Sequence, residues 1–155
     1  METSSAIFIG RFQPLHKGHL YALKYVAKRH AKFLIVIGSA QKKGKRNPFS
    51  VQTRKKMLNA VLRRNKLQAK IKILKDYSSN EKWVREFQKL AGNATCVYSN
   101  NSLVKKLCKK AGFSVVPIPF YKRYKYYATL IRERMHGKKS WKQLVPKEVL
   151  EIISS

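Results

Sequence analysis

Two histidines, His16 and His19, lie three residues apart where an apolar, strand-like run gives way to a helix-like stretch. Gly10 permits a turn that a residue with a Cβ would not make easily, and Gly18 allows a close backbone approach at the start of the expected helix. The first N–H groups of a helix and its dipole favour an anion, and Arg11 adds a donor at the same point. The pattern therefore predicts a phosphate-binding site.

A zinc site is the main alternative for these histidines, because imidazole is a common zinc ligand. No cysteine, aspartate or glutamate lies nearby in the sequence to complete a tetrahedral set, so we favour phosphate and expect no metal ligand among the protein side chains. The third possibility is a histidine on a helix surface without a functional role. This possibility fits His30 and His136 better than it fits the pair beside Pro14 and Gly18. The chain has neither a Gly-x-Gly-x-x-Gly turn after its first strand nor a Gly-Lys-Ser/Thr phosphate loop.

Short apolar runs alternate with amphipathic stretches along the chain, and they predict strands and helices respectively. The expected strands are 6–9, 33–37, 71–74, 95–98 and 113–117; the expected helices are 17–30, 50–64, 81–91 and 102–111, with two or three short helices from 129 onward. This order is typical of an α/β fold with a Rossmann-like parallel sheet and helices on both faces, followed here by short C-terminal helices. Such sheets bind ligands beyond the carboxyl ends of their strands, where the histidine pair lies.

The length of 155 residues suits one domain, which buries roughly 70% of the surface of the unfolded chain. We expect a single domain over residues 1–155, with its core in 6–117 and a C-terminal helical part in 128–155. No apolar run approaches the roughly 18 residues that a membrane span requires. The first residues lack the basic and apolar blocks of a signal peptide. We therefore expect a cytoplasmic protein that does not bind membranes.

The charge is the most unusual property, since 35 lysines and arginines against 7 aspartates and glutamates give a formal net charge of +28. Such a charge attracts polyanions. The basic residues occur in nearly every segment, so solvated helix faces explain them somewhat better than a dedicated nucleic-acid surface. Residues 121–127 hold four tyrosines among lysines and an arginine, and this segment would either line a nucleotide site or stack on bases.

The stretch Gly10-Arg-Phe-Gln-Pro-Leu-His-Lys-Gly-His19 resembles the signature of the nucleotidyltransferase superfamily that carries a His/Thr-x-Gly-His motif. Later segments are similar, in order and spacing, to archaeal-type nicotinamide-mononucleotide adenylyltransferases: Ile37-Gly-Ser-Ala40, Arg46-Asn-Pro-Phe49, Asp76 to Trp83, Tyr98-Ser-Asn-Asn101 and Thr129-Leu-Ile-Arg132. The first motif specifies only the superfamily, whereas the Arg-Asn-Pro-Phe and Asn-x-x-Trp segments indicate the subfamily. The resemblance covers almost the whole chain.

The resemblance implies that the adenylyl group of ATP is transferred to nicotinamide mononucleotide, giving NAD and pyrophosphate, with Mg²⁺ held mainly by the ATP phosphates. The attacking 5′-phosphate oxygen is already anionic, so positioning and charge neutralisation suffice without a protein nucleophile. The matching positions imply catalytic residues that contact phosphates: Arg11, His16, His19, Arg46 and Arg132. They imply ATP contacts at Gly10, Phe12, Gln13, Gly18, Ser39 and Thr129. They imply contacts with the mononucleotide at Trp83, through ring stacking, and at Asn80 and Asp76.

This sequence departs from the family pattern at two places. Tyr127 and Ala128 stand where small or hydroxyl residues usually precede Thr129, so phosphate contacts there would be fewer or come from the backbone. The helix after Pro48 usually carries Gly-Glu-Arg, whereas this chain has Gln52-Thr-Arg54. The absent acid would affect loop anchoring more than chemistry.

Several alternatives stay open at the level of sequence. Trp83 shares an apolar stripe with Val84 and Phe87, so a core role competes with ring stacking. Another superfamily member would use pantetheine phosphate, FMN or glycerol phosphate as the acceptor. From a different class, the chain could be a basic nucleic-acid-binding protein on the same fold. The resemblance also implies a homo-oligomer, commonly a hexamer, in which +28 subunits would need bound anions or a buried apolar interface.

Overall fold

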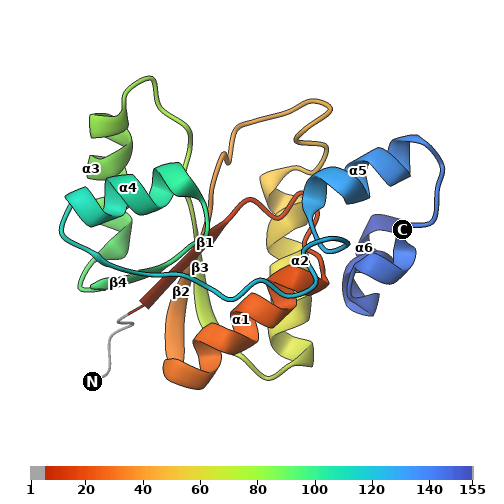
Figure 1. The fold of residues 1–155 in the computed structure, drawn as a ribbon, viewed down its shortest axis with the longest axis horizontal. Helices are drawn as coiled ribbons and strands as arrows, with labels where there is room; N and C mark the ends of the chain where they lie inside the picture. Colours follow the sequence, from red (N-terminus) through yellow and green to blue (C-terminus); the bar gives the residue numbers. More distant parts are fainter. Residues whose placement is uncertain (1–5, 155) are drawn as a thin grey trace.

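Five parallel strands form one sheet at the centre of the structure, a computed structural model that describes residues 6–154 (Figure 1). Residues 1–5, on which the expectation about a signal peptide rests, and residue 155 lie outside the described range. The strands are β1 (Ala6–Gly10), β2 (Lys32–Ile37), β3 (Gln68–Ile73), β4 (Cys96–Tyr98) and β5 (Ser114–Val116). Every neighbouring pair is parallel, which confirms the predicted α/β class.

The central strands are almost entirely apolar because both faces of the sheet are covered, and the exception is the exposed Lys32 at the start of β2. In β2, Phe33 and Ile35 belong to the core cluster on one face, while Leu34 and Val36 belong to the cluster on the other. Side chains alternate across a strand, so a run without polar residues is what two buried faces require. The five strand-like runs could therefore be located from the sequence.

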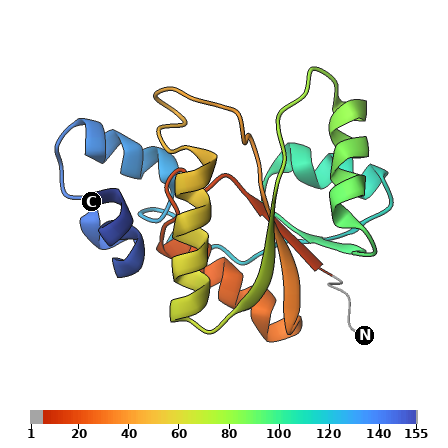
Figure 2. The ribbon, with the colours of Figure 1, turned by 180° about the vertical axis from the view of Figure 1, so that it is seen from behind.

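Helices cover the sheet on both faces (Figure 2). Two of them, α1 (Lys17–Arg29) and α2 (Val51–Arg64), pack on one face, and α3 (Asn80–Ala91) and α4 (Ser102–Lys110) pack on the other. The C-terminal elements are α5 (Ala128–His136), a 3-10 helix (Lys142–Leu144) and α6 (Lys147–Ser154), which packs against α2. Among the described residues, no helix is both long and apolar enough to span a bilayer. The extent of the single domain stays a prediction.

Most element boundaries agree with the sequence-based expectation to within a residue or two. The largest difference is β3, which was expected at 71–74 and begins at Gln68, because Lys32–Ile37 of β2 pairs along its whole length with Gln68–Ile73. Strand β3 lies at one edge of the sheet, and Lys70 and Lys72 alternate with apolar residues along it. A search for continuous apolar runs therefore does not recognise the first half of this strand. Ser50 caps α2 as expected, since its side chain accepts from the N–H of Thr53 at 3.1 Å.

The strand order is β3-β2-β1-β4-β5, so the chain reverses direction across the sheet at β1. The segment after β1 crosses to β2 on one side, whereas the segment after β3 returns to β4 on the other side. A crevice opens beyond the carboxyl ends of two strands at such a switch point. The turn after Gly10 therefore lies where the fold predicts a ligand.

Candidate active site

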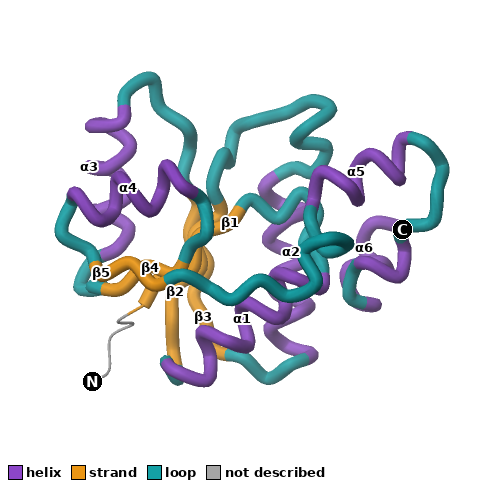
Figure 3. The backbone as a smooth tube through the Cα atoms, in the orientation of Figure 1, coloured by secondary structure: helices purple, strands orange, loops and turns teal. Residues whose placement is uncertain are grey.

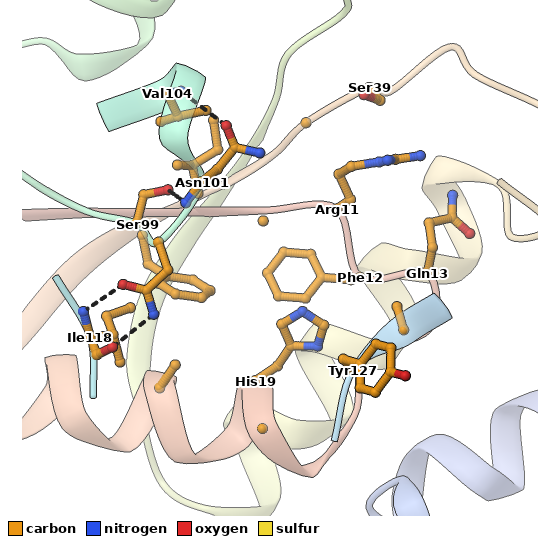
Figure 4. A pocket seen from close by; sticks show the side chains of 18 of the residues that line it. Arg11, Phe12, Gln13, His19, Ser39, Ser99, Asn101, Val104, Ile118 and Tyr127 are labelled. Atoms are coloured by element: carbon orange, nitrogen blue, oxygen red, sulfur yellow. Dashed lines mark hydrogen bonds between the residues drawn. The ribbon is translucent and has the colours of Figure 1, made fainter. Parts of the chain in front are cut away.

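A cavity of about 720 Å³ lies beyond the carboxyl ends of the strands, at the switch point between β1 and β4. Its walls come from the turns after β1, β2, β3 and β4, from the first turns of α1, α3, α4 and α5, and from the loop between β5 and α5 (Figure 4). The residues with expected roles that line it are Gly10, Arg11, Phe12, Gln13, His16, Gly18, His19, Ser39, Asp76, Asn80, Trp83, Thr129 and Arg132. The structure thus brings together thirteen of the fourteen predicted positions; Arg46 is not among the lining residues.

The two histidines cap the first turn of α1 in a reciprocal way. Nδ1 of His16, the N-cap residue, accepts from the N–H groups of Gly18 at 3.0 Å and His19 at 3.3 Å. Nδ1 of His19 accepts from the N–H of His16 at 3.0 Å, and the two rings stack with their centroids 3.8 Å apart. A neutral imidazole whose Nδ1 accepts carries its proton on Nε2. Both rings therefore hold a donor that the helix cap does not use.

Burial keeps both rings neutral in the ligand-free chain. Burial is the main cause that lowers the pKa of His16 well below 6.5, and the charge of His19 lowers it further. Burial likewise lowers the pKa of His19 to about 3. At neutral pH the pair thus offers hydrogen-bond donors rather than full charges, and a phosphate beside it would favour protonation. This agrees with the role of phosphate-facing donors rather than with that of a strong general base.

Two glycines make room for these rings. A Cβ at Gly18 would lie 2.8 Å from Cε1 of His16 and 3.1 Å from the carbonyl oxygen of Tyr126, so the predicted close approach at the helix start is present. A Cβ at Gly10 would lie 3.0 Å from Cζ of Phe12, and this ring packs against the ring of His19 with centroids 4.8 Å apart (Figure 4). Gly10 is therefore required for close packing rather than for an unusual backbone angle.

Gln13 joins the turn after β1 to the loop that precedes α2. Its side-chain amide donates to the carbonyl of Phe49 and accepts from the N–H of Phe49, both at 2.9 Å. The backbone carbonyl of Gln13 accepts from Nη1 of Arg132 at 2.7 Å. Because both polar ends of the amide are used by the protein, Gln13 acts in this structure by positioning the loop, and its expected ATP contact stays a prediction.

Two arginines that line the cavity, Arg11 and Arg132, concentrate positive charge together with Arg46, which lies close to Arg132. Arg132, in α5, sits beside Thr129, whose hydroxyl oxygen accepts from Nη2 at 3.5 Å. Burial lowers the pKa of Arg132, and the charges of Arg11 and Arg46 lower it further. Arg11 donates to the side chain of Asn47 in the loop that carries Arg46. The three arginines therefore form a cluster of mutually repelling cations whose repulsion an anionic ligand would relieve, and their expected clamp on the phosphates stays a prediction.

Arg54 in α2 is a residue of the site that the sequence interpretation missed. It is fully buried, and its guanidinium donates to the backbone carbonyls of Arg11 (3.1 Å), Gly38 (3.0 Å), Ser39 (3.3 Å) and Ala40 (3.2 Å). Burial lowers its pKa, and the charge of Arg11 adds to this. The side chain thus ties the turns after β1 and β2 together beneath the cavity.

A signal for Arg54 was present in the sequence. The residues at 57, 58, 61 and 62 are Met, Leu, Val and Leu, so position 54 lies on the buried stripe of its helix. A long polar side chain on such a stripe must find partners inside the protein. Arg54 anchors these turns through their backbone carbonyls, and the expected effect of the absent acid on loop anchoring stays a prediction.

The far end of the cavity carries the residues expected to hold the acceptor. Ser39 donates to Oδ1 of Asp76 at 3.1 Å, and Oδ2 of Asp76 lies 4.0 Å from Nζ of Lys42. Asn80 opens helix α3, and Trp83 follows one turn later, half-buried. The ring of Trp83 stacks on Phe87 with centroids 5.2 Å apart and an interplanar angle of 6°. Trp83 thus packs on the core and also lines the cavity, and its expected stacking on nicotinamide stays a prediction.

The first turn of α5 differs from those of the four preceding helices, α1 to α4. Its N-cap residue is Tyr127, which makes no side-chain hydrogen bond to the helix, whereas α1, α2, α3 and α4 are all capped by side chains. Tyr127, Ala128 and Thr129 line the cavity. Uncapped N–H groups at a helix start favour a bound anion. The departure at Tyr127 and Ala128 therefore leaves backbone donors available beside Arg132.

Comparisons with known proteins agree with this geometry. Residues 7–134 match the Cytidylyltransferase-like family. Over 150 residues the chain is 38% identical to the nicotinamide-nucleotide adenylyltransferase of Pyrococcus horikoshii, covering 95% of this chain and 81% of that protein. This chain belongs to the nicotinamide-nucleotide adenylyltransferase family. A second member, from Methanosarcina mazei, is 38% identical over 97% of this chain and 87% of its own length.

Solved structures show the same fold as this adenylyltransferase-family chain. A bifunctional NMN adenylyltransferase/ADP ribose pyrophosphatase from Francisella tularensis matches with a TM-score of 0.80 and 26% identity over 93% of this chain. The complex of such a protein with AMP and a manganese ion, also from Francisella tularensis, matches with a TM-score of 0.77 and 24% identity over 99% of this chain. This chain spans 45% and 52% of those two longer chains.

The donor set of this family member fits a metal bound through its substrate. Among residues 6–154, no three His, Cys, Asp or Glu side chains gather closely enough to hold a metal ion. Asp76 is the acid among the residues that line the cavity. Mg²⁺ prefers a few carboxylates together with substrate phosphates and water. The side chains here suit a metal that arrives with a polyphosphate.

Proposed function

We propose that this chain transfers the adenylyl group of ATP to nicotinamide mononucleotide, with release of pyrophosphate and formation of NAD. The observation that carries the proposal is the pair of Nε2–H donors of His16 and His19, held neutral at the start of α1 and facing the same cavity as Arg132. Donors fixed in advance where charge develops are the main catalytic device of phosphoryl-type transfer.

In the proposed reaction, the anionic 5′-phosphate oxygen of the mononucleotide forms a bond to the α-phosphorus of ATP. The bond from that phosphorus to the bridging oxygen breaks, and its electron pair leaves with pyrophosphate. His16 and His19 donate to the phosphates through Nε2, and Arg11, Arg46 and Arg132 offset the charge of the leaving group. When bound, Mg²⁺ would neutralise the triphosphate further. Arg54 and Gln13 hold the two loops that carry these donors.

The proposed acceptor site is the part of the cavity lined by Asp76, Asn80 and Trp83. Nicotinamide would stack on the face of the Trp83 ring that Phe87 leaves uncovered, and Asn80 and Asp76 would bind polar groups of the mononucleotide. The names of the relatives agree with this acceptor. Two free cysteines, Cys96 and Cys108, suit a reducing compartment such as the cytoplasm. The expected homo-oligomer stays a prediction, which light scattering would test.

Purified protein given ATP, MgCl₂ and one acceptor at a time would test the assignment. We expect NAD from nicotinamide mononucleotide and far slower adenylylation of pantetheine phosphate or FMN, with products separated by chromatography. The same protein given CTP and glycerol phosphate should form no cytidylyl product. If nicotinamide mononucleotide gave no NAD while another acceptor was modified, the acceptor would be wrong but the transferase class would stand.

Trp83→Ala tests the acceptor site more closely. Loss of the stacked ring should raise the KM for nicotinamide mononucleotide by about tenfold, since aromatic pairs contribute about 0.5–1.5 kcal/mol beyond area burial. The KM for ATP should change little, and Trp83→Phe should recover much of the loss. Trp141→Ala is the matched control, because this second indole packs on the core outside the cavity. An unchanged KM for the mononucleotide in Trp83→Ala would restrict Trp83 to a core role.

A further inference from the structure

Most of the positive charge on this chain has no acidic partner. The acids are confined to a few places, so that residues 3–75 and residues 87–132 contain none: the acids are Glu2, Asp76, Glu81, Glu86, Glu133, Glu148 and Glu151. Within residues 6–154 the ion pairs are Lys42 with Asp76 and Lys89 with Glu86. One substrate triphosphate accounts for the cluster at Arg132 but not for this wider excess. The surface therefore attracts further polyanions.

One segment adds exposed aromatic rings to that charge. We name residues 120–127 the aromatic-basic turn; it lies in the loop between β5 and α5, which curls tightly beside α5 (Figure 3). Phe120 and Tyr124 are 62% and 75% exposed. The turn is closed by the N–H groups of Lys125 and Tyr126, which both donate to the carbonyl of Lys122 at 3.0 Å. Two large rings this exposed in one tight, charged turn are available to a binding partner.

A stack of tyrosines holds the turn in place. The ring of Tyr121 lies parallel to that of Tyr21 in α1, with centroids 4.5 Å apart and an interplanar angle of 7°. It also stacks on Tyr126, with centroids 5.7 Å apart and an angle of 16°. Lys122 and Lys125 hold their ammonium groups 5.5 and 5.0 Å from the ring centroids of Tyr121 and Tyr126. The tip of the turn is thus presented on a fixed base, which limits the entropy lost when a ligand binds.

The aromatic-basic turn has two sides. Phe120, Tyr121, Arg123, Tyr126 and Tyr127 line the active-site cavity. Lys122, Tyr124 and Lys125 do not line it, and Tyr124 makes no ring contact with any other described residue. The outward side is therefore not occupied by a nucleotide in the cavity. The exposed ring of Tyr124 offers a stacking face, and Lys122 and Lys125, close to it in the sequence, supply phosphate-binding charge in the same turn.

We infer that Lys122, Tyr124 and Lys125 form a binding surface for single-stranded nucleic acid, separate from the substrate cavity. A base stacks on the ring of Tyr124, and the flanking phosphates contact the two ammonium groups, which is how single strands are bound without sequence preference. A duplex keeps its bases stacked and cannot use the ring. An anionic membrane would use a contiguous apolar face, whereas the residues of the turn that do not line the cavity are one tyrosine, Tyr124, and two lysines.

The decisive measurement is the affinity for a labelled oligouridylate of about 16 nucleotides, the upper site size of small single-strand-binding folds. Tyr124→Ala should weaken binding at least about fivefold, the lower limit for one stacked base. The double variant Lys122→Gln/Lys125→Gln should lower the slope of log affinity against log salt by about 1.4, or about 0.7 for each lost contact. The matched control is Lys109→Gln/Lys110→Gln, which removes the same charge from an exposed helix end in α4.

Three outcomes would overturn the inference. Equal losses in the two double variants would show that binding follows total charge rather than this surface. An equal effect of Tyr124→Ala on an abasic strand of the same length would show that no base stacks on the ring. Tighter binding to phosphatidylserine vesicles than to the oligouridylate, lost in Tyr124→Ala, would assign the tip to membranes. NAD formation by each variant reports correct folding, because Tyr124, Lys122 and Lys125 lie outside the substrate cavity.

Discussion

Replacing Arg54 by methionine should loosen the two loops that carry the phosphate-binding residues. Methionine keeps much of the aliphatic length of arginine but donates no hydrogen bond. The substitution removes the donor from the carbonyls of Arg11, Gly38, Ser39 and Ala40 at once. These carbonyls lie in the turns after β1 and β2, which help to line the cavity, so the loss should affect both folding and catalysis.

The size of the effect follows from the burial of each bond. The bond to Gly38 is buried, and an unpaired carbonyl there costs about 1–3 kcal/mol. The other bonds are partly buried, so water replaces some of them and each contributes about 0.5–1.5 kcal/mol. Removing a buried charge that has no acidic partner returns part of this sum. We expect a net loss of about 2–4 kcal/mol, a large fraction of the roughly 5–15 kcal/mol that stabilises a domain.

Urea unfolding and NAD-formation kinetics together measure this effect. Arg54→Met should lower the free energy of unfolding by the stated amount and should raise the KM for ATP more than that for nicotinamide mononucleotide. Arg54→Lys keeps the charge but not the planar set of donors, so its free energy of unfolding should lie between those of Arg54→Met and the unsubstituted protein. Arg64→Met, at an exposed position of the same helix, is the matched control. A change of less than about 0.5 kcal/mol in Arg54→Met, the size expected of a surface site, would refute the anchoring role.

Two further substitutions test the start of α1. Gly18→Ala would place a Cβ 3.1 Å from the carbonyl oxygen of Tyr126, so urea unfolding should show a less stable protein, although alanine usually stabilises a helix by about 0.5–1 kcal/mol relative to glycine. In the control Gly38→Ala the atom nearest to the new Cβ lies 3.9 Å away, so stability should fall less. A larger loss of stability in Gly38→Ala than in Gly18→Ala would contradict the packing argument. His19 has a pKa of about 3 in the folded chain and 6.5 unfolded, so the unfolded chain binds more protons between these values and stability should fall as the pH drops below about 6.5, by up to about 1.4 kcal/mol per pH unit. His19→Asn should flatten that dependence and His136→Asn should not; parallel pH profiles for His19→Asn and the unsubstituted protein would show that His19 is not held neutral.

The strands and helices could be predicted from the sequence because the apolar pattern of each element lies within its own residues. The run Phe33 to Ile37 has no polar residue, which only a strand buried on both faces or a short buried helix explains, and the alternating pattern along the chain decides between them. The edge strand β3 was placed less well, because its lysines are set by exposure at the sheet edge rather than by the core. The location of the cavity followed from topology alone.

The sequence predicted most of the residues that line the cavity, but not the contacts that hold them in place. The positions around His16 and His19 were found, but the mutual cap that fixes both rings depends on three-dimensional hydrogen bonds that no residue pattern specifies. Gly10 was expected to serve a turn and instead makes room for Phe12. Arg54 was passed over because, in a chain with 35 basic residues, an arginine on a helix is usually exposed.

The three arginines around the cavity also act on the protein when no substrate is bound. Arg11 and Arg46 destabilise the charged form of Arg132, so their repulsion opposes folding of the empty chain. Salt would screen this repulsion and stabilise the empty protein, while competing with a nucleotide for the same guanidinium groups. Ionic strength therefore moves stability and substrate affinity in opposite directions. In this acid-poor chain an anionic substrate would therefore act as a counter-ion that stabilises the folded protein.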